Sequence, residues 1–252
     1  MAPIRTAAAW CRQCEAFAPT PRKLQWCIMF IDRQFARRVY NSLAPRDLRV
    51  AVTIRRTRPL WRRAGLIFIH IPKAAGTSVN MALIGRSPGH ATAAQVRTFA
   101  PVEFRDLPTF SLVRNPWARC LSTYRFVRNG GSDVPIWRPE RFQRREFRSF
   151  AAFVEEWLVE QDVRRTDVVF RPQHQFIADG TGAVLVDHVG FVERMPETAT
   201  YLEETFGRKV EIGHLNRTNG EPTDYHSFYT SGLVDTVGKI YARDVEMFGY
   251  SF

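Results

Sequence analysis

Residues 72–78 combine a lysine, small residues and two hydroxyls, directly after a short apolar run. A loop of this kind between a strand and a helix presents backbone N–H groups to an anion, and the positive end of the helix dipole adds to the attraction. Lys73 contributes a mobile positive charge. Unlike a guanidinium group, its ammonium group can lose a proton. The loop therefore predicts chemistry at a bound anionic group, and a tight turn with a solvated lysine is the alternative.

The lysine loop differs from a Walker A phosphate-binding loop, G-x-x-x-x-G-K-[ST]. In that pattern the lysine follows the second glycine. Here Lys73 precedes Gly76 by three residues, and no glycine stands upstream at the required place. A kinase or phosphotransferase that uses a nucleotide and Mg²⁺ is therefore disfavoured, but it stays open as an alternative function.

A second polar group follows the apolar run 109–113. Arg114 is expected to project from the end of a strand, and Ser122 lies about two turns into the helix predicted after it. A guanidinium fork and a hydroxyl suit a phosphate monoester, provided that the helix packs back over the strand end. Alternatively, Arg114 pairs with an acid and Ser122 is an ordinary helix serine.

Alternating strand and helix patterns place both groups at strand ends. The apolar runs 66–71 and 109–113 predict buried strands, and the next helices are predicted over 77–84 and 116–128. Asn115 is the expected N-cap of the second helix, with Pro116 as its first residue. Further along, the pattern predicts an amphipathic helix over 147–158, a strand over 183–189, and helices over 196–206 and 233–248. The chain is therefore expected to have an α/β fold with a mainly parallel sheet, in which ligands bind at the carboxyl ends of the strands.

Charge divides the chain into a basic N-terminal segment, residues 1–64, and a neutral domain, residues 65–252. The net charge is +11, and the first segment holds 14 of the 36 basic residues but only three of the 25 acidic ones, which leaves 22 of each in the remainder. The segment is either a solvated arm or a contact for an anionic surface, such as nucleic acid, acidic glycan or lipid headgroups. Its role stays open.

Composition excludes several classes of protein. With 45% hydrophobic and 13% aromatic residues, the chain is too apolar for intrinsic disorder, and no apolar run reaches the length of a transmembrane helix. Four cysteines are too few for a disulfide scaffold of this size. Cys11 and Cys14 have the spacing of a metal site but lack a second pair or a nearby histidine, so no metal site is predicted. No secretory signal is recognised, and we expect a cytoplasmic protein.

Segments 68–78 and 112–124 together resemble the 5′-phosphosulfate loop and the 3′-phosphate motif of sulfotransferases that use 3′-phosphoadenosine 5′-phosphosulfate (PAPS). The resemblance is closest to the carbohydrate branch, which includes the heparan and uronyl 2-O-sulfotransferases and their bacterial relatives. Further segments similar to this family follow in the expected order, at 171–176, 189–193, 214–218 and 241–250. The resemblance therefore spans residues 66–252.

The resemblance implies a P-loop-related three-layer fold, with helices on both faces of the sheet. It also implies in-line transfer of a sulfuryl group from PAPS to a hydroxyl of an acceptor, by default a glycan. The 5′-phosphosulfate would be held by Lys73, Ala74, Ala75, Gly76, Thr77 and Ser78. Arg114 and Ser122 would hold the 3′-phosphate, while Arg217 and Thr218 would lie on a loop that closes over the nucleotide. Lys73 would neutralise charge on the leaving oxygen, so that no metal ion is required.

His90 is the predicted general base for the acceptor hydroxyl, because members of this branch carry a histidine or a carboxylate between the two motifs. An imidazole with a pKa near neutrality can take up a hydroxyl proton. Glu103 and Asp106 are weaker candidates in the same interval. His70 is expected to pack on the first strand. A loop histidine without a catalytic role is the alternative for His90.

The identity of the acceptor and the oligomeric state stay open. A cluster of arginines could meet an acidic acceptor or form the solvated face of a helix: Arg138, Arg141, Arg144, Arg145 and Arg148. No specific nucleic-acid partner is predicted. Besides the kinase, the other alternative function is a non-catalytic module that binds an anion through the basic segment.

Overall fold

The computed structural model describes residues 45–131, 136, 139–207 and 224–252. It divides the chain into two compact units, Met1–Arg49 and Val50–Phe252, and the second contains the predicted site. Arg217 and Thr218, predicted to close over the nucleotide, lie outside the described residues, as does Arg138.

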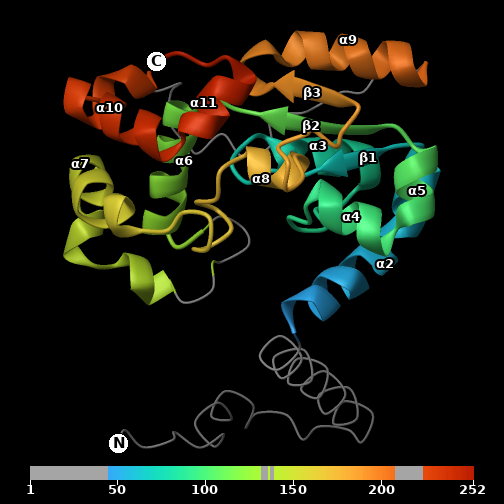
Figure 1. The fold of residues 1–252 in the computed structure, drawn as a ribbon, viewed down its shortest axis with the longest axis horizontal. Helices are drawn as coiled ribbons and strands as arrows, with labels where there is room; N and C mark the ends of the chain where they lie inside the picture. Colours follow the sequence, from blue (N-terminus) through green and yellow to red (C-terminus); the bar gives the residue numbers. More distant parts are fainter. Residues whose placement is uncertain (1–44, 132–135, 137–138, 208–223) are drawn as a thin grey trace, which may run out of the picture. The chain divides into compact units, whose positions relative to one another are not determined.

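A parallel sheet with the strand order β1–β2–β3 lies at the centre of the second unit (Figure 1). Its strands are β1 (Ile67–Ile69), β2 (Thr109–Val113) and β3 (His188–Phe191). Phe68 pairs with Phe110, which in turn pairs with His188. Every residue of β1 and β2 is buried, which explains why their sequences carry no charged residue. The two predicted strands are confirmed, although β1 is shorter than expected.

The strand predicted over 183–189 is displaced along the chain. Residues 183–185 fold back onto the end of the preceding helix, where Leu185 N donates to Ile177 O (2.7 Å) and Val184 forms an isolated antiparallel bridge with Ala178. The parallel strand begins only after Asp187, whose carboxylate accepts hydrogen bonds from the backbone N–H and the hydroxyl of Thr109. Residues 183–185, which follow the glycine turn at 180–182, therefore make a local contact and do not join the parallel sheet.

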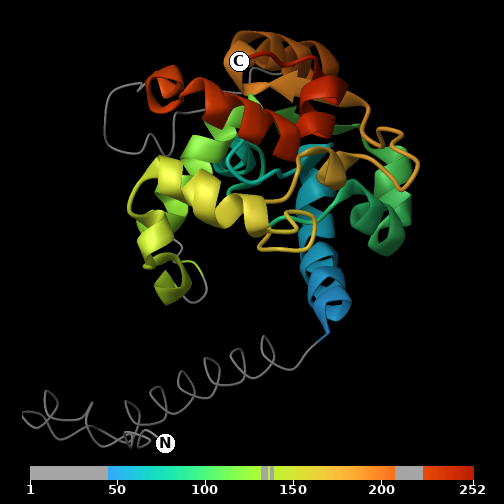
Figure 2. The same cartoon turned by 60° about the vertical axis from the view of Figure 1, so that its left-hand side comes forward.

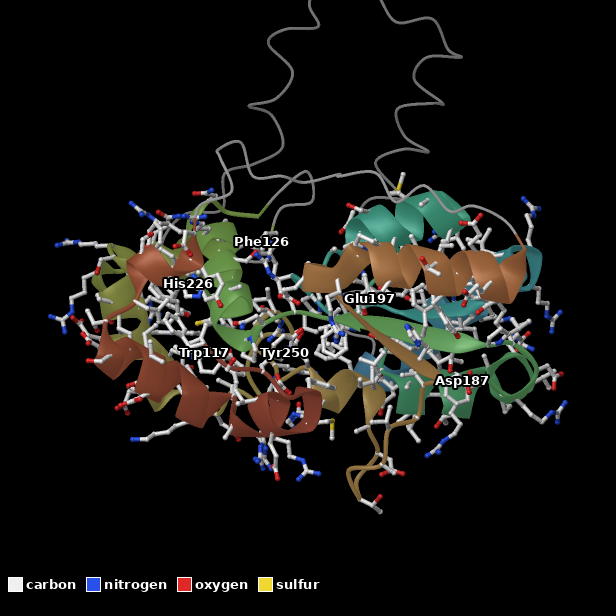
Figure 3. All side chains as sticks on the ribbon, turned by 90° about the horizontal axis from the view of Figure 1, so that it is seen from above. Trp117, Phe126, Asp187, Glu197, His226 and Tyr250 are labelled. Carbon is white, nitrogen blue, oxygen red and sulfur yellow. The ribbon has the colours of Figure 1, made fainter. Side chains whose placement is uncertain are left out.

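Helices cover both faces of this sheet (Figure 3). On one face, α3 (Gly76–Ile84) and α9 (Met195–Phe206) pack on Phe68, Phe110 and Leu112. The other face is covered by α2 (Arg46–Ala64), α4 (Ala93–Phe99) and the short α8 (His174–Ile177), which share a core with β1. The order of layers is helix, sheet, helix, which confirms the predicted fold class.

The change in charge placed the domain boundary at residue 65, but the compact unit begins earlier in the chain. From Val50 onward, α2 belongs to this unit, because Ile54 and Trp61 are buried in the core beneath the sheet. Two of the helix's arginines also pair with the buried carboxylate of Glu103 on α5 (Pro101–Asp106). The run of arginines here therefore lies on the outer face of a packed helix.

A group of helices at one end of the sheet carries a second, aromatic core (Figures 1 and 2). Its longest members are α6 (Pro116–Arg128), α10 (Ser231–Ile240) and α11 (Ala242–Phe248). The shorter turns are η2 (Pro139–Phe142), η3 (Arg145–Phe147), α7 (Phe150–Ala152), η4 (Phe153–Trp157), η5 (Leu158–Glu160) and η7 (Tyr225–Phe228). Outside this group, η6 (Val192–Arg194) joins β3 to α9. Within the described residues, no helix is long and apolar enough to cross a membrane.

Two predicted helices in this group depart from a regular α-helix. The amphipathic helix expected over 147–158 begins at Phe150 and continues to Glu160, with α-helical (α7), π-helical (η4) and 3₁₀ (η5) hydrogen bonding in succession. Its Phe153 and Trp157 rings pack against Phe170. The C-terminal helix breaks at Tyr241, whose hydroxyl donates to Phe170 O (2.9 Å). By contrast, α6 begins as predicted, with Asn115 Oδ1 accepting from the first backbone N–H groups.

The C-terminal tail crosses the start of α6. Asn115 Nδ2 donates to Ser251 O (2.9 Å), and the Phe252 ring packs edge-on against Trp117, with ring centroids 5.7 Å apart. Tyr229 from the segment before α10 also contacts the Phe252 ring, with centroids 5.2 Å apart. The tail therefore supports the helix that follows the end of β2.

Candidate functional site

The loop between β1 and α3 has an uncommon backbone conformation. Lys73 (φ 65°) and Ala75 (φ 56°) both lie in the left-handed region, which costs a non-glycine residue about 1–2 kcal/mol. Left-handed residues in such turns direct backbone N–H groups toward one side, where they can bind an anion. The first turn of α3 has no side-chain cap that would occupy its N–H groups. Ala74 and Gly76 are buried, and Thr77 and Ser78 lie in that first turn.

Gly76 is required by the close approach of a histidine ring. A Cβ at this position would lie only 1.9 Å from Cδ2 of His70. His70 follows β1 directly, is buried as predicted, and has its Nδ1 3.3 Å from Ser87 Oγ. The imidazole thus packs against Gly76, the first residue of α3, and supports the end of the lysine loop.

The ammonium group of Lys73 lies in a cationic environment. Its Nζ is 4.3 Å from the centroid of the Phe126 ring on α6, and Arg114 Nη1 donates to its carbonyl oxygen (3.4 Å). Burial, together with the charges of Arg114 and Arg119, lowers the pKa of Lys73 to about 8. Among the described residues, neither Lys73 nor Arg114 forms an ion pair with a carboxylate. The charge of Glu193 acts on Arg114 and offsets part of this positive charge. Two buried cations without a direct ion pair are still costly in the free protein and favour a bound anion.

Arg119 holds the lysine loop from α6, and sequence reasoning assigned it no role. Its guanidinium is buried and donates to three carbonyl oxygens, those of Pro72 (3.0 Å), Val169 (3.2 Å) and Arg171 (2.8 Å). It therefore fixes the residue before Lys73. The only sequence signal was its place among the apolar residues of α6, and that signal is weak in a chain rich in arginine.

Ser122 lies on the face of α6 that packs against the lysine loop. Arg119, three residues before it, contacts Pro72, and Phe126, four residues after it, contacts Lys73. Residues at these spacings share one helix face. The helix therefore packs back toward the strand end, which is the condition on which the pairing of Ser122 with Arg114 depended.

Arg125 adds a further positive charge to this region, which the sequence had not indicated. Burial is the main cause that lowers the pKa of Arg114, and the charges of Arg119 and Arg125 add to it. The Arg125 guanidinium also stacks 4.8 Å from the centroid of the partly exposed Phe228 ring on η7. Cationic side chains from the lysine loop, the end of β2 and α6 are thus gathered in one place.

His90 is placed as a neutral imidazole with a basic Nε2. Its Nδ1 lies 3.1 Å from His70 O, and because a carbonyl oxygen only accepts, Nδ1 carries the proton. Burial is the main cause that lowers the pKa of His90, and the charges of Arg119 and Lys73 act in the same direction, whereas Asp167 opposes them. These charges act on His90 because it lies in the same region as the lysine loop.

The other candidates from the sequence are engaged elsewhere. Glu103 accepts a hydrogen bond from Arg58 Nε (2.8 Å), and Asp106 pairs with Arg105 at the surface. Both carboxylates are therefore neutralised by arginines. Of the described arginines in the cluster after α6, Arg141 and Arg145 lie on short 3₁₀ turns, Arg144 and Arg148 flank the second turn, and Arg145 approaches Glu156 (3.8 Å). The described residues contain no group of three or more histidines, cysteines and acids that could hold a metal ion.

A family model described as "Sulfotransferase family" matches residues 62–251, which include the whole sheet, the lysine loop and α6. Comparisons with curated proteins and with solved structures gave no match.

Proposed function

Because the chain belongs to the sulfotransferase family, it is an enzyme that transfers a sulfuryl group to a hydroxyl-bearing acceptor, and we propose that its donor is PAPS and its acceptor a carbohydrate. The helix–sheet–helix layers are the P-loop-related fold of that family. Family membership favours sulfuryl transfer over the phosphoryl transfer of a kinase. The observation that carries the donor proposal is the cluster of Lys73 and Arg114, neither of which forms a direct ion pair with a carboxylate among the described residues.

The residues at the two strand ends fit the anionic groups of this donor. Backbone N–H groups of residues 73–78 and the Lys73 ammonium suit a phosphosulfate, and Arg114 with Ser122 suits a separate phosphate monoester. When bound, PAPS supplies an activated sulfuryl group. Arg217 and Thr218 remain proposed contacts of the nucleotide on the basis of the sequence resemblance.

Lys73 stabilises the negative charge that develops on the leaving oxygen. With a pKa of about 8, Lys73 is protonated in most molecules at neutral pH, so its positive charge is present during the reaction. Arg119 keeps the loop in place by holding Pro72 O. A preorganised cation of this kind needs no rearrangement during the reaction.

His90 accepts the proton of the acceptor hydroxyl on Nε2 as the sulfur–oxygen bond forms. Its Nδ1–H stays on His70 O, which fixes the tautomer and the orientation of the ring. Because burial lowers its pKa, the imidazole is uncharged at neutral pH and able to act as a base.

The donor is tested by thermal unfolding with adenosine 3′,5′-bisphosphate, using ADP with Mg²⁺ for comparison. At 100 times its dissociation constant, a ligand stabilises the fold by about 2.7 kcal/mol. Only the bisphosphate is expected to stabilise the protein, and Arg114→Ala is expected to abolish this effect. The control is Arg97→Ala on the exposed face of α4. Stabilisation by ADP with Mg²⁺ alone would overturn the donor proposal.

The base and the acceptor are tested by turnover with PAPS and a panel of polysaccharides and small phenols. His90→Gln should reduce kcat by about a hundredfold or more, whereas Asp106→Asn, at the weaker candidate, should not change it. Wild-type kcat should fall as the pH drops below 6.5, because the pKa of His90 is lowered, and also as the pH rises above about 8, where Lys73 loses its proton. Full activity of His90→Gln refutes the proposed base, and sulfation of phenols alone refutes the carbohydrate acceptor.

A further inference from the structure

The carboxamide of Gln173 binds both backbone polar groups of Arg114. Arg114 N donates to Gln173 Oε1 (2.9 Å), and Gln173 Nε2 donates to Arg114 O (2.8 Å). Gln173 is completely buried, so both bonds are shielded from water. One side chain therefore satisfies the peptide groups on both sides of the Arg114 Cα atom.

These bonds replace strand pairing at the point where the sheet ends. The pairing of β2 with β1 ends at Ser111, and its pairing with β3 ends at Val113. Beyond that residue the chain has no strand neighbour, and buried backbone groups require other partners. Gln173 supplies them for Arg114, and Glu193 Oε1 accepts from Asn115 N (2.7 Å).

Gln173 is itself held by a buried carboxylate on α11. Asp244 Oδ2 accepts from Gln173 N (2.6 Å), and its Oδ1 accepts from His174 N (2.9 Å). His174 Nδ1 also lies 2.7 Å from Asp244 Oδ1, and Asp244 is fully buried. Arg119 fixes the same segment through Arg171 O. The position of the Gln173 carboxamide is thus determined before any ligand binds.

We propose that Gln173 is a positioning residue for the 3′-phosphate site, through its grip on the backbone of Arg114; this rests on the proposed function. The guanidinium of Arg114 projects from a Cα atom whose two neighbouring peptide groups are held by one side chain. Rotation of that backbone would move the guanidinium out of the position proposed for binding the 3′-phosphate. Gln173 bonds to Arg114 and not to the lysine loop, so its main effect is expected at the 3′-phosphate. A smaller effect on the loop is expected through the hydrogen bond from Arg114 Nη1 to Lys73 O.

The test compares two probes, adenosine 3′,5′-bisphosphate and 5′-AMP, which lacks the 3′-phosphate. Calorimetry on the full chain gives the ratio of their dissociation constants. Gln173→Glu keeps the shape but loses the donor to Arg114 O, and it should reduce the preference for the bisphosphate by about tenfold. The affinity for 5′-AMP should stay within about twofold of wild type. Gln175→Glu is the matched control, because Gln175 is partly exposed and lies in α8, the short helix that begins directly after Gln173.

The outcomes separate the two proposals. An unchanged preference in Gln173→Glu overturns the positioning role, and so does an equal loss of affinity for both probes, which marks a merely structural residue. If Gln173→Glu fails to fold, Gln173→Met removes both hydrogen bonds without burying a charge and must show the same selective loss. A wild-type protein that binds both probes equally refutes the proposed 3′-phosphate site itself, and the positioning role with it.

Discussion

Replacing Lys73 with methionine should stabilise the free protein at neutral pH. In the folded chain the Lys73 pKa is about 8 instead of its ordinary 10.5, because the ammonium is buried beside Arg114 and Arg119. The folded state therefore binds this proton less tightly than the unfolded state does. At pH 7 the difference destabilises the fold by about 3 kcal/mol. Loss of the cation–π contact with Phe126 offsets about 1 kcal/mol of the gain, so the expected net gain is about 2 kcal/mol.

The sign of this effect determines its pH dependence. As the pH rises above 8, Lys73 loses its proton in the folded protein first, and the penalty disappears by about pH 10.5. The advantage of Lys73→Met over wild type should therefore fall to about 1 kcal/mol at pH 10. Urea unfolding of both proteins at pH 7, 8.5 and 10 measures this difference in the free energy of unfolding.

The control for this experiment is Lys239→Met on the exposed face of α10, which should change the free energy of unfolding by less than about 0.5 kcal/mol. A Lys73→Met protein that is less stable than wild type at pH 7 refutes the reasoning. That result would mean that the free protein compensates the cationic cluster in some other way. A gain in stability of Lys73→Met that does not depend on pH would also contradict the reasoning, because the penalty arises from the Lys73 charge, which is lost between pH 8 and 10.5.

Three further substitutions test the packing around the lysine loop. Gly76→Ala should destabilise the fold by about 1–3 kcal/mol and abolish bisphosphate binding, because the new Cβ displaces the His70 ring. Arg119→Lys should cost about 2–4 kcal/mol in urea unfolding, since an ammonium cannot reach all three carbonyls. Glu103→Gln should cost about 1–2 kcal/mol at pH 7. Burial alone would raise the Glu103 pKa, but the hydrogen bond and charges of two α2 arginines lower it below 4.5, so this difference should vanish as the pH falls below that value.

Each of these has its own control or contrary result. Gly180→Ala, where a Cβ meets no atom within 4 Å, should leave stability unchanged. Bisphosphate binding that survives in Gly76→Ala would show that the loop tolerates a shift of His70. Equal stability of Arg119→Lys and wild type would show that the buried guanidinium is not what holds Pro72. A Glu103→Gln effect that persists at pH 3 would mean that packing, and not charge, is responsible.

The parts of the fold set by local chemistry could be predicted from the sequence. Asn115 and Pro116 define the start of α6 because an N-cap and a first-turn proline act within a few residues, and the apolar run of β2 was found at its observed bounds. The break at Tyr241 was not predicted, and the hydroxyl there donates to a carbonyl far along the chain, at Phe170, a contact that local sequence does not reveal. The displaced β3 has a similar cause, because Asp187 and Thr109 meet only once the sheet has formed.

For the candidate site, the sequence indicated the groups that carry distinctive chemistry but not the ones that hold them. Lys73, Arg114 and His90 stand out by type and spacing, and the structure brings them into one region. Arg119 and Gln173 act on backbone groups of other segments. No residue pattern predicts which carbonyl a buried arginine or carboxamide will meet.

The packed C-terminal tail bears on how the protein should be produced for these assays. Residues fused after Phe252 would begin at a ring that lies between Trp117 and Tyr229, beside the carbonyl of Ser251 that receives a hydrogen bond from Asn115. A C-terminal affinity tag would pull on the cap of α6, and thus on the helix that carries Arg119 and Ser122. A purification tag at the other end of the chain avoids this strain, so a comparison of the two tagged forms should precede any conclusion from weak activity.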